Sequence, residues 1–165
     1  MIILKKNIKL LNILLILIVL SYNCNLVYAA GTTTNGYNEI SLYKAGKSLV
    51  IRAKKQEKKN RNEKAKKLYL KAYDKFEKAY SKDKKNADIL NYLGYTLRKT
   101  GNLEEAEIYY LKGLELDSTH LGINEYLGEL YVQTNRIDLA KKRLDVLAGC
   151  NCEEYEELKE LIENK

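Results

Sequence analysis

The sequence contains no proline and no tryptophan, and its 165 residues include one phenylalanine, one histidine and three cysteines. Without proline, the chain lacks a residue that breaks helices and marks tight turns. A turn-rich β-sandwich is therefore disfavoured, and long helices are favoured. Aromatic packing must come mainly from tyrosine, which occurs 14 times. The length suits one domain of ordinary size.

The scarcity of histidine argues against catalysis. The single histidine, His120, has no accompanying Ser/His/Asp set, and the chain has neither a phosphate-binding loop nor a His-Glu-x-x-His motif. We expect His120 to cap a helix end. Glu125 and Glu129 lie one helical turn apart, but two carboxylates are too few for a dedicated calcium site. The sequence therefore predicts no enzyme, no cofactor and no metal centre.

No hydrophobic run in the sequence reaches the roughly 20 residues that a membrane-spanning helix needs. Lysines near the start are followed by the run Leu10–Leu20, which is apolar except for Asn12, and small residues stand at Val27 and Ala29. This layout is typical of a secretory signal peptide over residues 1–29, with cleavage after Ala29. An uncleaved membrane anchor is the less favoured alternative, because the run is about half of the roughly 20 residues that a spanning helix needs.

Few cysteines are present. Cys24 follows Asn23, where lipidation prefers a small residue, so a lipoprotein is disfavoured. Signal cleavage would remove Cys24 and leave Cys150 and Cys152 in an oxidising compartment. Residues two apart point away from each other on a helix, so a disulfide between them requires a turn, where it would stop one helix and fix the start of the next. A redox site, a metal site, free thiols and a cross-linked dimer are the alternatives.

The chain contains an internal repeat. Residues 30–38 are polar and are predicted to be a disordered linker, whereas nearly everything from residue 39 onward has a helical pattern. Two segments superpose at a shift of 34 residues, which pairs Gly94 with Gly128 and Ala106 with Ala140. We expect the glycines where two helices of a pair cross, and the alanines where the second helix packs closely. Residues that tolerate a left-handed backbone occupy the expected turns, Gly101-Asn102 and Thr134-Asn135.

Extending this register predicts repeats 87–120 and 121–154, a degenerate repeat 53–86 and a capping helix 153–163. The degenerate repeat has Lys59-Asn60 where Leu-Gly is expected. Residues 39–60 are predicted to form an N-terminal capping helix. Its expected buried side chains are those of Ile40, Tyr43, Leu49, Val50 and Ala53. The closing helix is expected to bury Leu158, Leu161 and Ile162.

These residues resemble the tetratricopeptide repeat family over about Ala72 to Cys152. The stretches "NADILNYLGYTLRKTGNLEEA" and "EYLGELY" and the ending in Cys followed by "EEYEEL" are similar to small secreted tetratricopeptide proteins of Gram-negative bacteria. The resemblance implies an all-α, right-handed solenoid of helix pairs with capping helices at both ends, and a periplasmic location. The chain departs from the family where a proline usually ends each repeat, at Lys84, Ser118 and Cys152.

The resemblance also implies that a ligand lies in a concave groove lined by the first helix of each pair. The corresponding positions are Asp88, Asn91, Tyr95 and Arg98 in one repeat and Gly122, Glu125, Glu129 and Val132 in the next. Asn91 offers an amide to a peptide backbone, Tyr95 a flat ring and Arg98 a fork for a carboxylate. The lysine and asparagine pattern of tetratricopeptide domains that hold chaperone tails is absent. A non-enzymatic periplasmic scaffold for a peptide or protein partner is predicted; a polar, solvated helix face is the alternative.

Charge is unevenly distributed. Residues 39–86 contain 17 basic and 6 acidic side chains, whereas residues 87–165 contain 9 basic and 16 acidic ones. The basic residues within 44–85 suit an anionic membrane or envelope surface, or the acidic half of a second copy. A solvated lysine face is the simpler alternative, and nucleic acid is not expected because a secreted protein rarely meets it. Two other functions compete with the scaffold: thiol-redox or metal handling through Cys150 and Cys152, and self-association of a structural protein. The oligomeric state stays open.

Overall fold

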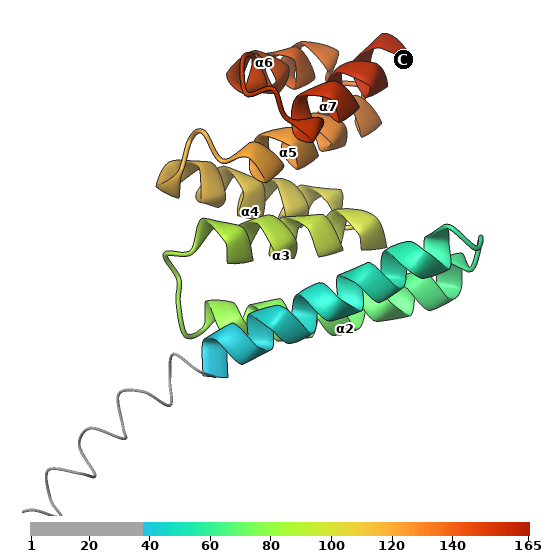
Figure 1. The fold of residues 1–165 in the computed structure, drawn as a ribbon, viewed down its shortest axis with the longest axis vertical. Coiled ribbons are helices and arrows are strands. Elements are labelled where there is room, and N and C mark those ends of the chain that lie inside the picture. Colours follow the sequence, from blue (N-terminus) through green and yellow to red (C-terminus); the bar gives the residue numbers. More distant parts are fainter. Residues whose placement is uncertain (1–37) are drawn as a thin grey trace, which may run out of the picture. The chain divides into compact units, whose positions relative to one another are not determined.

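The computed structural model describes residues 38–165, so the predicted signal peptide and nearly all of the predicted linker lie outside the described part. The described chain starts with a helix over residues 38–57 and continues with six more helices (Figure 1). They are α2 (Asn62–Tyr80), α3 (Ala87–Thr100), α4 (Leu103–Leu116), α5 (Leu121–Gln133), α6 (Ile137–Leu147) and α7 (Glu153–Glu163). Residues 38–165 contain no strand, and none of their helices is long and apolar enough to cross a membrane.

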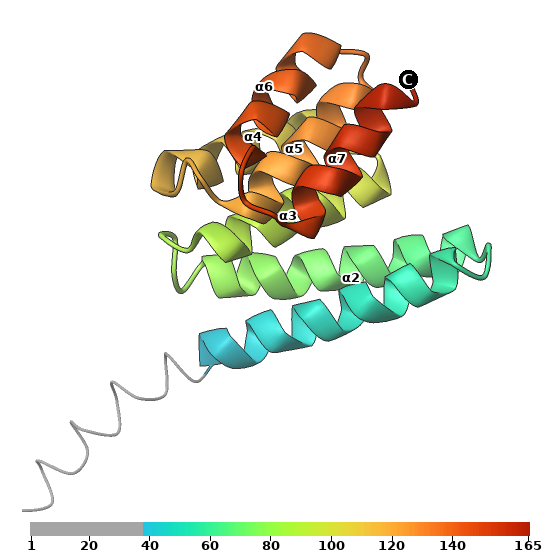
Figure 2. The same cartoon turned by 45° about the horizontal axis from the view of Figure 1, so that its top comes forward.

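The helices form stacked pairs. Helix 38–57 pairs with α2, α3 with α4, and α5 with α6, while α7 packs against both α5 and α6 (Figure 2). First helices also contact along the stack, because α3 contacts α5, and α5 contacts the closing helix α7. The predicted all-α solenoid of helix pairs is therefore confirmed. The predicted closing helix over residues 153–163 coincides with α7.

The turns inside the three pairs have the same backbone geometry. Each has one residue with a positive φ, which is 54° at Asn60, 97° at Gly101 and 59° at Asn135. The next residue donates its N–H to a carbonyl five residues back, a bond that ends a helix after a left-handed residue. These bonds run from Arg61 to Gln56, from Asn102 to Leu97 and from Arg136 to Tyr131. The left-handed turns predicted at Gly101-Asn102 and Thr134-Asn135 are confirmed.

The first pair is longer than the others. Gly94 and Gly128 each precede the left-handed residue of their turn by seven positions. In the first pair the corresponding glycine is Gly46, which precedes Asn60 by fourteen positions. The second helix is lengthened equally, because Phe76 follows Asn60 by sixteen positions, whereas the matching Tyr110 follows Gly101 by nine. Each helix of the first pair therefore has seven extra residues, close to two full turns, so the same faces stay aligned.

This extension changes the predicted boundaries. The first pair occupies residues 38–80, and residue 53, where the degenerate repeat was predicted to begin, lies inside helix 38–57. A fixed period of 34 residues places Lys59-Asn60 at the helix crossing, whereas the structure places these two residues in the turn. Helix 38–57 is thus the first helix of a complete pair. The long hairpin, formed by helix 38–57, the turn at Asn60 and α2, extends past the end of the α3–α4 pair (Figure 1).

The crossing glycines show why no side chain fits there. A Cβ built on Gly46 would lie 2.6 Å from the ring of Phe76, and one on Gly94 would lie 2.5 Å from the ring of Tyr110. Both rings belong to the second helix of the same pair, as predicted for Gly94. Gly128 differs, because its neighbour is Leu158 of α7. The close contact with Gly128 was predicted for α6, the second helix of the pair, but it is made by the closing helix α7.

The core consists of two clusters, one centred on the first pair and α3 and the other on α4 to α7. Both predicted alanines are fully buried, and Leu158, Val50 and Ala53 are buried as predicted. Ile40 is 50% exposed and Leu161 is 39% exposed, so their predicted burial is wrong. Both lie on the terminal helices of the stack, which have a neighbouring helix on one side only among residues 38–165.

Candidate peptide-binding groove

The predicted groove residues lie on the first helices, but most of them are not freely exposed. Asp88 is exposed at its side chain and contacts His120. The others are half-buried or fully buried, and Asn91, Tyr95, Glu125 and Val132 are more than nine-tenths buried. The reason is that neighbouring first helices contact each other, so side chains along their shared edge are covered by the next repeat.

A ridge of aromatic rings and charges crosses this face and is formed by Tyr69, Tyr95, Arg98, Tyr126 and Glu129. Tyr95 is 4% exposed, and its ring lies 5.8 Å from that of Tyr69 and 4.8 Å from that of Tyr126. Burial is the main cause that raises the pKa of Tyr95. The guanidinium of Arg98 lies 5.7 Å from the centroids of both Tyr95 and Tyr126, and it forms a 2.7 Å ion pair with Glu129.

The ridge corrects two expectations. The ring of Tyr95, predicted to face a ligand, is covered by two other tyrosines. The guanidinium of Arg98, predicted to receive a ligand carboxylate, instead binds the carboxylate of Glu129 on the neighbouring repeat. Both side chains therefore connect first helices to one another, and the open parts of the face lie on either side of them.

Two hollows collect most of the predicted groove residues, and the larger of these two has a volume of about 460 Å³. It is lined by helix 38–57, α3, the loop between α4 and α5, α5 itself and the start of α7. Of the predicted groove residues, the hollow collects Asp88, Asn91, Gly122 and Glu125. Lining residues that were not predicted include Tyr43, Lys47, Tyr92, Asp117, Tyr126 and Glu154. The alignment of Gly46 with Gly94 would have placed Tyr43 and Lys47 on the groove face.

His120 fixes one wall of this hollow. Its Nδ1 accepts the N–H of Ile123 at 3.2 Å and so caps α5, which confirms the predicted capping role. In the neutral ring the hydrogen then resides on Nε2, which lies 3.3 Å from Asp88 Oδ1 and can donate to it. His120 therefore joins the start of α5 to the start of α3.

Asn91 lines the same hollow, and the oxygen of its amide has no partner within residues 38–165. The residue is 6% exposed. A Cβ built on Gly122 would lie 2.9 Å from Asn91 Nδ2, so the absence of a side chain at Gly122 leaves room for the amide. A buried acceptor without a donor costs free energy unless a ligand or water satisfies it.

Glu125 is a buried carboxyl group in the hollow. It is 3% exposed, and within the described helices it forms no ion pair with a basic side chain. Burial is the main cause that raises its pKa to about 9, and a hydrogen bond to Glu157 and the charges of Glu129, Glu157 and Glu154 act in the same direction. The hollow thus holds a carboxyl group that lacks a partner of opposite charge.

The smaller hollow, of about 310 Å³, lies on the other side of the ridge. It contains the predicted groove residues Arg98, Glu129 and Val132, together with side chains from the end of α7, whereas Tyr95 lines neither hollow. The ion pair between Arg98 and Glu129 neutralises the charges at its inner wall. The predicted groove is therefore not continuous, and Arg98 also borders a further hollow of about 470 Å³ on the side of α2.

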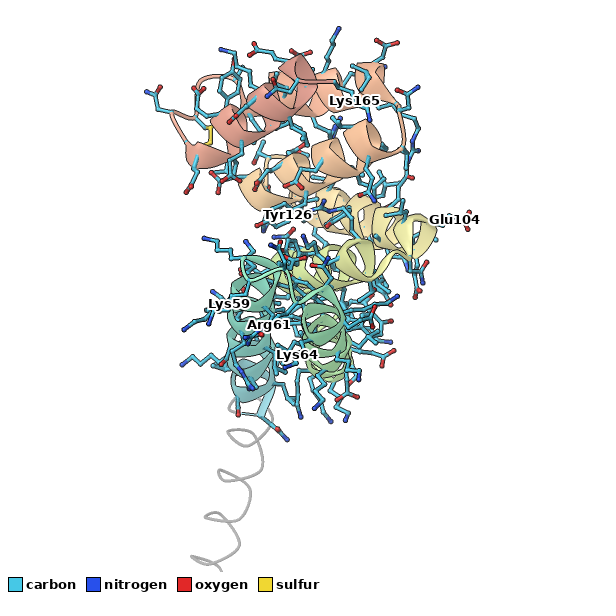
Figure 3. The ribbon with its side chains drawn as sticks, turned by 90° about the vertical axis from the view of Figure 1, so that its right-hand side faces the viewer. Lys59, Arg61, Lys64, Glu104, Tyr126 and Lys165 are labelled. Carbon is cyan, nitrogen blue, oxygen red and sulfur yellow. A yellow bond between two sulfur atoms is a disulfide. The ribbon has the colours of Figure 1, made fainter. Side chains whose placement is uncertain are left out.

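Cys150 and Cys152 lie in the connection between α6 and α7, where a turn was required. Their Cα atoms are 5.2 Å apart, a separation typical of paired cysteines, and their sulfur atoms face each other (Figure 3). Gly149 and Asn151 both have positive φ values, so the segment is out of helical conformation. Residues 38–165 contain no group of three or more His, Cys, Asp or Glu side chains able to hold a metal ion.

The end of the long hairpin is strongly basic. Its nine cationic side chains are all exposed, and no ion pair within the described helices involves any of them. They are Arg52, Lys54, Lys55, Lys58, Lys59, Arg61, Lys64, Lys66 and Lys67. Only two acidic residues, Glu57 and Glu63, lie in the same segment, and Glu57 is already paired with Lys99. Lys59, Arg61 and Lys64 lie together on this hairpin in Figure 3.

Stacked helix pairs with a hollowed face of first helices define a helical-repeat scaffold, a class that offers a surface to another molecule. A family model described as tetratricopeptide repeat matches residues 56–119. The match covers 64 of the 165 residues and identifies this segment as tetratricopeptide repeat, a family that is generally non-catalytic and commonly binds peptide or protein partners. A search of curated proteins returns no match to this sequence.

Three solved structures illustrate the similarity of fold. The type III secretion chaperone SycD of Yersinia enterocolitica, in complex with a peptide of the translocator YopD, is 19% identical, with a TM-score of 0.51 over 72% of this chain and 86% of that one. The second tetratricopeptide domain of human RPAP3, in complex with an HSP70 peptide, is 18% identical, with a TM-score of 0.51 over 77% and 99%. The Arabidopsis OM64 domain is 13% identical, with a TM-score of 0.50 over 74% and 98%. At these identities the likeness concerns the fold alone.

Proposed function

We propose that the protein is an exported, non-enzymatic scaffold that binds a segment of a partner protein in the larger hollow. The observation that carries this proposal is Asn91, a residue that lines the hollow and whose buried Oδ1 has no partner in the described chain. An extended segment offers backbone N–H groups at regular intervals, and one of them can satisfy this acceptor. The volume of about 460 Å³ suits a few residues of such a segment.

Site-specific photocrosslinking in cells tests this proposal. A benzophenone side chain at Leu121, which lines the hollow and is 40% exposed, is expected to capture a partner. The same substitution at Leu111, which is 44% exposed on α4 and outside the hollow, serves as the matched control. Adding Asn91→Ala should abolish the crosslink at Leu121. Equal capture at both positions, or capture that survives Asn91→Ala, would contradict the proposed groove.

Export to the periplasm and pairing of the cysteines are part of the same proposal. The predicted signal peptide supports export, and the close approach of Cys150 and Cys152 supports a disulfide that fixes the start of α7. In an oxidising compartment this disulfide is expected to form. Intact-mass spectrometry of protein from the cell envelope should give an N-terminus at Ala30 and a mass lower than that of the reduced chain by two hydrogen atoms. A free-thiol mass would leave redox chemistry as the better account of the pair.

A second candidate function is contact with an anionic membrane or envelope surface through the basic residues 44–85. The nine exposed, unpaired cations of the hairpin favour it within the described chain, as does Ile51, which is 66% exposed beside them. Basic side chains next to exposed apolar ones are typical of peripheral membrane contact.

Co-sedimentation with vesicles separates this function from a solvated lysine face. Binding is expected to vesicles that contain phosphatidylglycerol, not to pure phosphatidylcholine, and to decrease at high salt. Replacing Lys58, Lys59 and Arg61 with serine should weaken it severalfold. Serine at the three exposed lysines Lys112, Lys141 and Lys142 removes the same charge elsewhere and should have little effect. Equal losses in both variants would mean that net charge alone drives the binding.

A further inference from the structure

The larger hollow is acidic. Four carboxyl groups line it, from Asp88, Asp117, Glu125 and Glu154, against the single ammonium of Lys47. They come from α3, α5, α7 and the loop that precedes α5, so the fold brings them together from separate segments. A cationic group is the ligand chemistry that this lining attracts, because like charges that share a site repel and an opposite charge relieves the repulsion.

The hollow also has a wall of tyrosine rings, formed by Tyr43, Tyr92 and Tyr126. The faces of two of these rings already accept an ammonium group. Lys47 Nζ lies 5.4 Å from the centroid of Tyr43 and 5.8 Å from that of Tyr92, within the range of a cation–π contact. Aromatic rings beside carboxylates bind organic cations, whereas a bare metal ion would need several converging oxygen ligands. No such converging group exists in residues 38–165.

Two buried polar groups in this hollow have unmet requirements in the described chain. Glu125 is more than nine-tenths buried and has no cationic partner, and the Oδ1 of Asn91, equally buried, has no donor. An arriving ammonium or guanidinium group would favour the ionised form of Glu125, whose proton passes to water, and would supply its counter-charge. A backbone N–H of the same ligand would supply the donor for Asn91. The two requirements are met together by a cationic side chain carried on a peptide.

We propose that the larger hollow binds a lysine or arginine side chain of its partner, with the charged group against Glu125 and the tyrosine rings and the adjoining backbone against Asn91. The inference rests on the proposed peptide-binding function and specifies its partner as a basic segment. In this respect the hollow is opposite in charge to a groove that holds a carboxylate.

Titration of the full-length chain, followed by the backbone amide NMR signals of Gly122 and Glu125, tests the inference. The probes are three acetylated pentapeptides of alanine whose central residue is lysine, norleucine or glutamate, and n-butylammonium as a cation without a peptide backbone. The lysine peptide should bind about tenfold more tightly than the norleucine peptide, because the two differ only in the charged group. Butylammonium should bind more weakly than the lysine peptide, because it lacks the backbone that Asn91 would contact.

Variants assign the effect to the hollow. Glu125→Gln keeps the shape of the side chain but cannot ionise, so it should reduce affinity for the lysine peptide to that for the norleucine peptide. Glu104→Gln removes a carboxylate from an exposed position on α4, outside the hollow, and should change neither affinity.

The outcomes distinguish this inference from the proposed function. If all three peptides bind equally and Asn91→Ala weakens all of them, the hollow binds peptide, and recognition of a cation is overturned. If butylammonium binds as tightly as the lysine peptide, the cation site stands, and peptide binding is overturned. If no probe shifts the amide signals of Gly122 and Glu125, both are overturned.

Discussion

The buried carboxyl group of Glu125 gives the folded state a pH dependence that one substitution should remove. Its pKa is raised from 4.5 to about 9 in the folded chain, because burial and three neighbouring glutamates, Glu129, Glu154 and Glu157, disfavour its charge. Folding therefore favours the protonated form. The contribution of this group to stability is fully present below its unfolded pKa of 4.5 and is lost as the pH rises from 4.5 to about 9.

The magnitude follows from the interval between the two pKa values. Each pH unit within that interval lowers the free energy of unfolding by about 1.4 kcal/mol for a fully buried group. Neutral pH lies about 2.5 units above the unfolded pKa, which gives about 3 kcal/mol. Because Glu125 lines an open hollow, solvent screens part of this effect, and we expect about 2 kcal/mol. Glu125→Gln avoids this loss, because a glutamine side chain does not titrate.

Urea unfolding of the wild type and of Glu125→Gln, measured from about pH 5 to pH 8, checks this value. The variant should match the wild type at the acidic end and become more stable by about 2 kcal/mol at neutral pH. Other titrating groups occur in both proteins and cancel in the difference. Glu104→Gln, at an exposed site, should show no such pH trend. A stability difference that stays constant with pH would refute the reasoning, because it would mean that Glu125 titrates normally in the folded chain.

Three further predictions concern the helix pairs. Gly46→Ala places a methyl group 2.6 Å from the ring of Phe76 and should lower the free energy of unfolding by about 1 to 3 kcal/mol in urea titrations; an unchanged stability would show that this crossing has room to spare. Asn60→Ala puts a side chain without a local hydrogen bond at φ 54° and should cost about 1 kcal/mol by the same assay, whereas Asn60→Gly should not. Arg136 donates two hydrogen bonds, of 2.9 and 2.7 Å, to the carboxylate of Glu107. Glu107→Gln should therefore lower the melting temperature by a few degrees at low salt and by less at high salt. Equal shifts at both salt concentrations would argue against an ionic contribution.

The fold was predictable because its signals are local and repeated. Small residues at fixed spacing, such as Gly94 and Ala106, and left-handed turn residues, such as Gly101 and Asn135, report contacts within one helix pair. The first pair obeys the same rules, but its turn is displaced by seven residues along each helix. A fixed period cannot detect such an insertion, and Gly46 was therefore missed.

The groove was predictable in position but not in accessibility. The register correctly placed Asp88, Asn91 and Glu125 on one face. Whether a side chain on that face is open depends on the next first helix, which is a contact between repeats. The pairing of Arg98 with Glu129 joins positions 31 residues apart, and no pattern within a single repeat reveals it. The tyrosine wall was hidden for the same reason, because Tyr43 and Tyr126 belong to different pairs.

The extension of the first pair has a consequence for how this scaffold can change. Seven residues added to each helix lengthen the hairpin by about 10 Å, since each residue rises about 1.5 Å. The addition keeps the contact of Gly46 with Phe76 in register, because it is close to two whole turns. The length of the basic hairpin can therefore change by seven residues in each of its two helices at a time, while the hollow keeps its shape. Length and recognition are separate variables in this protein, and mutation can alter either one alone.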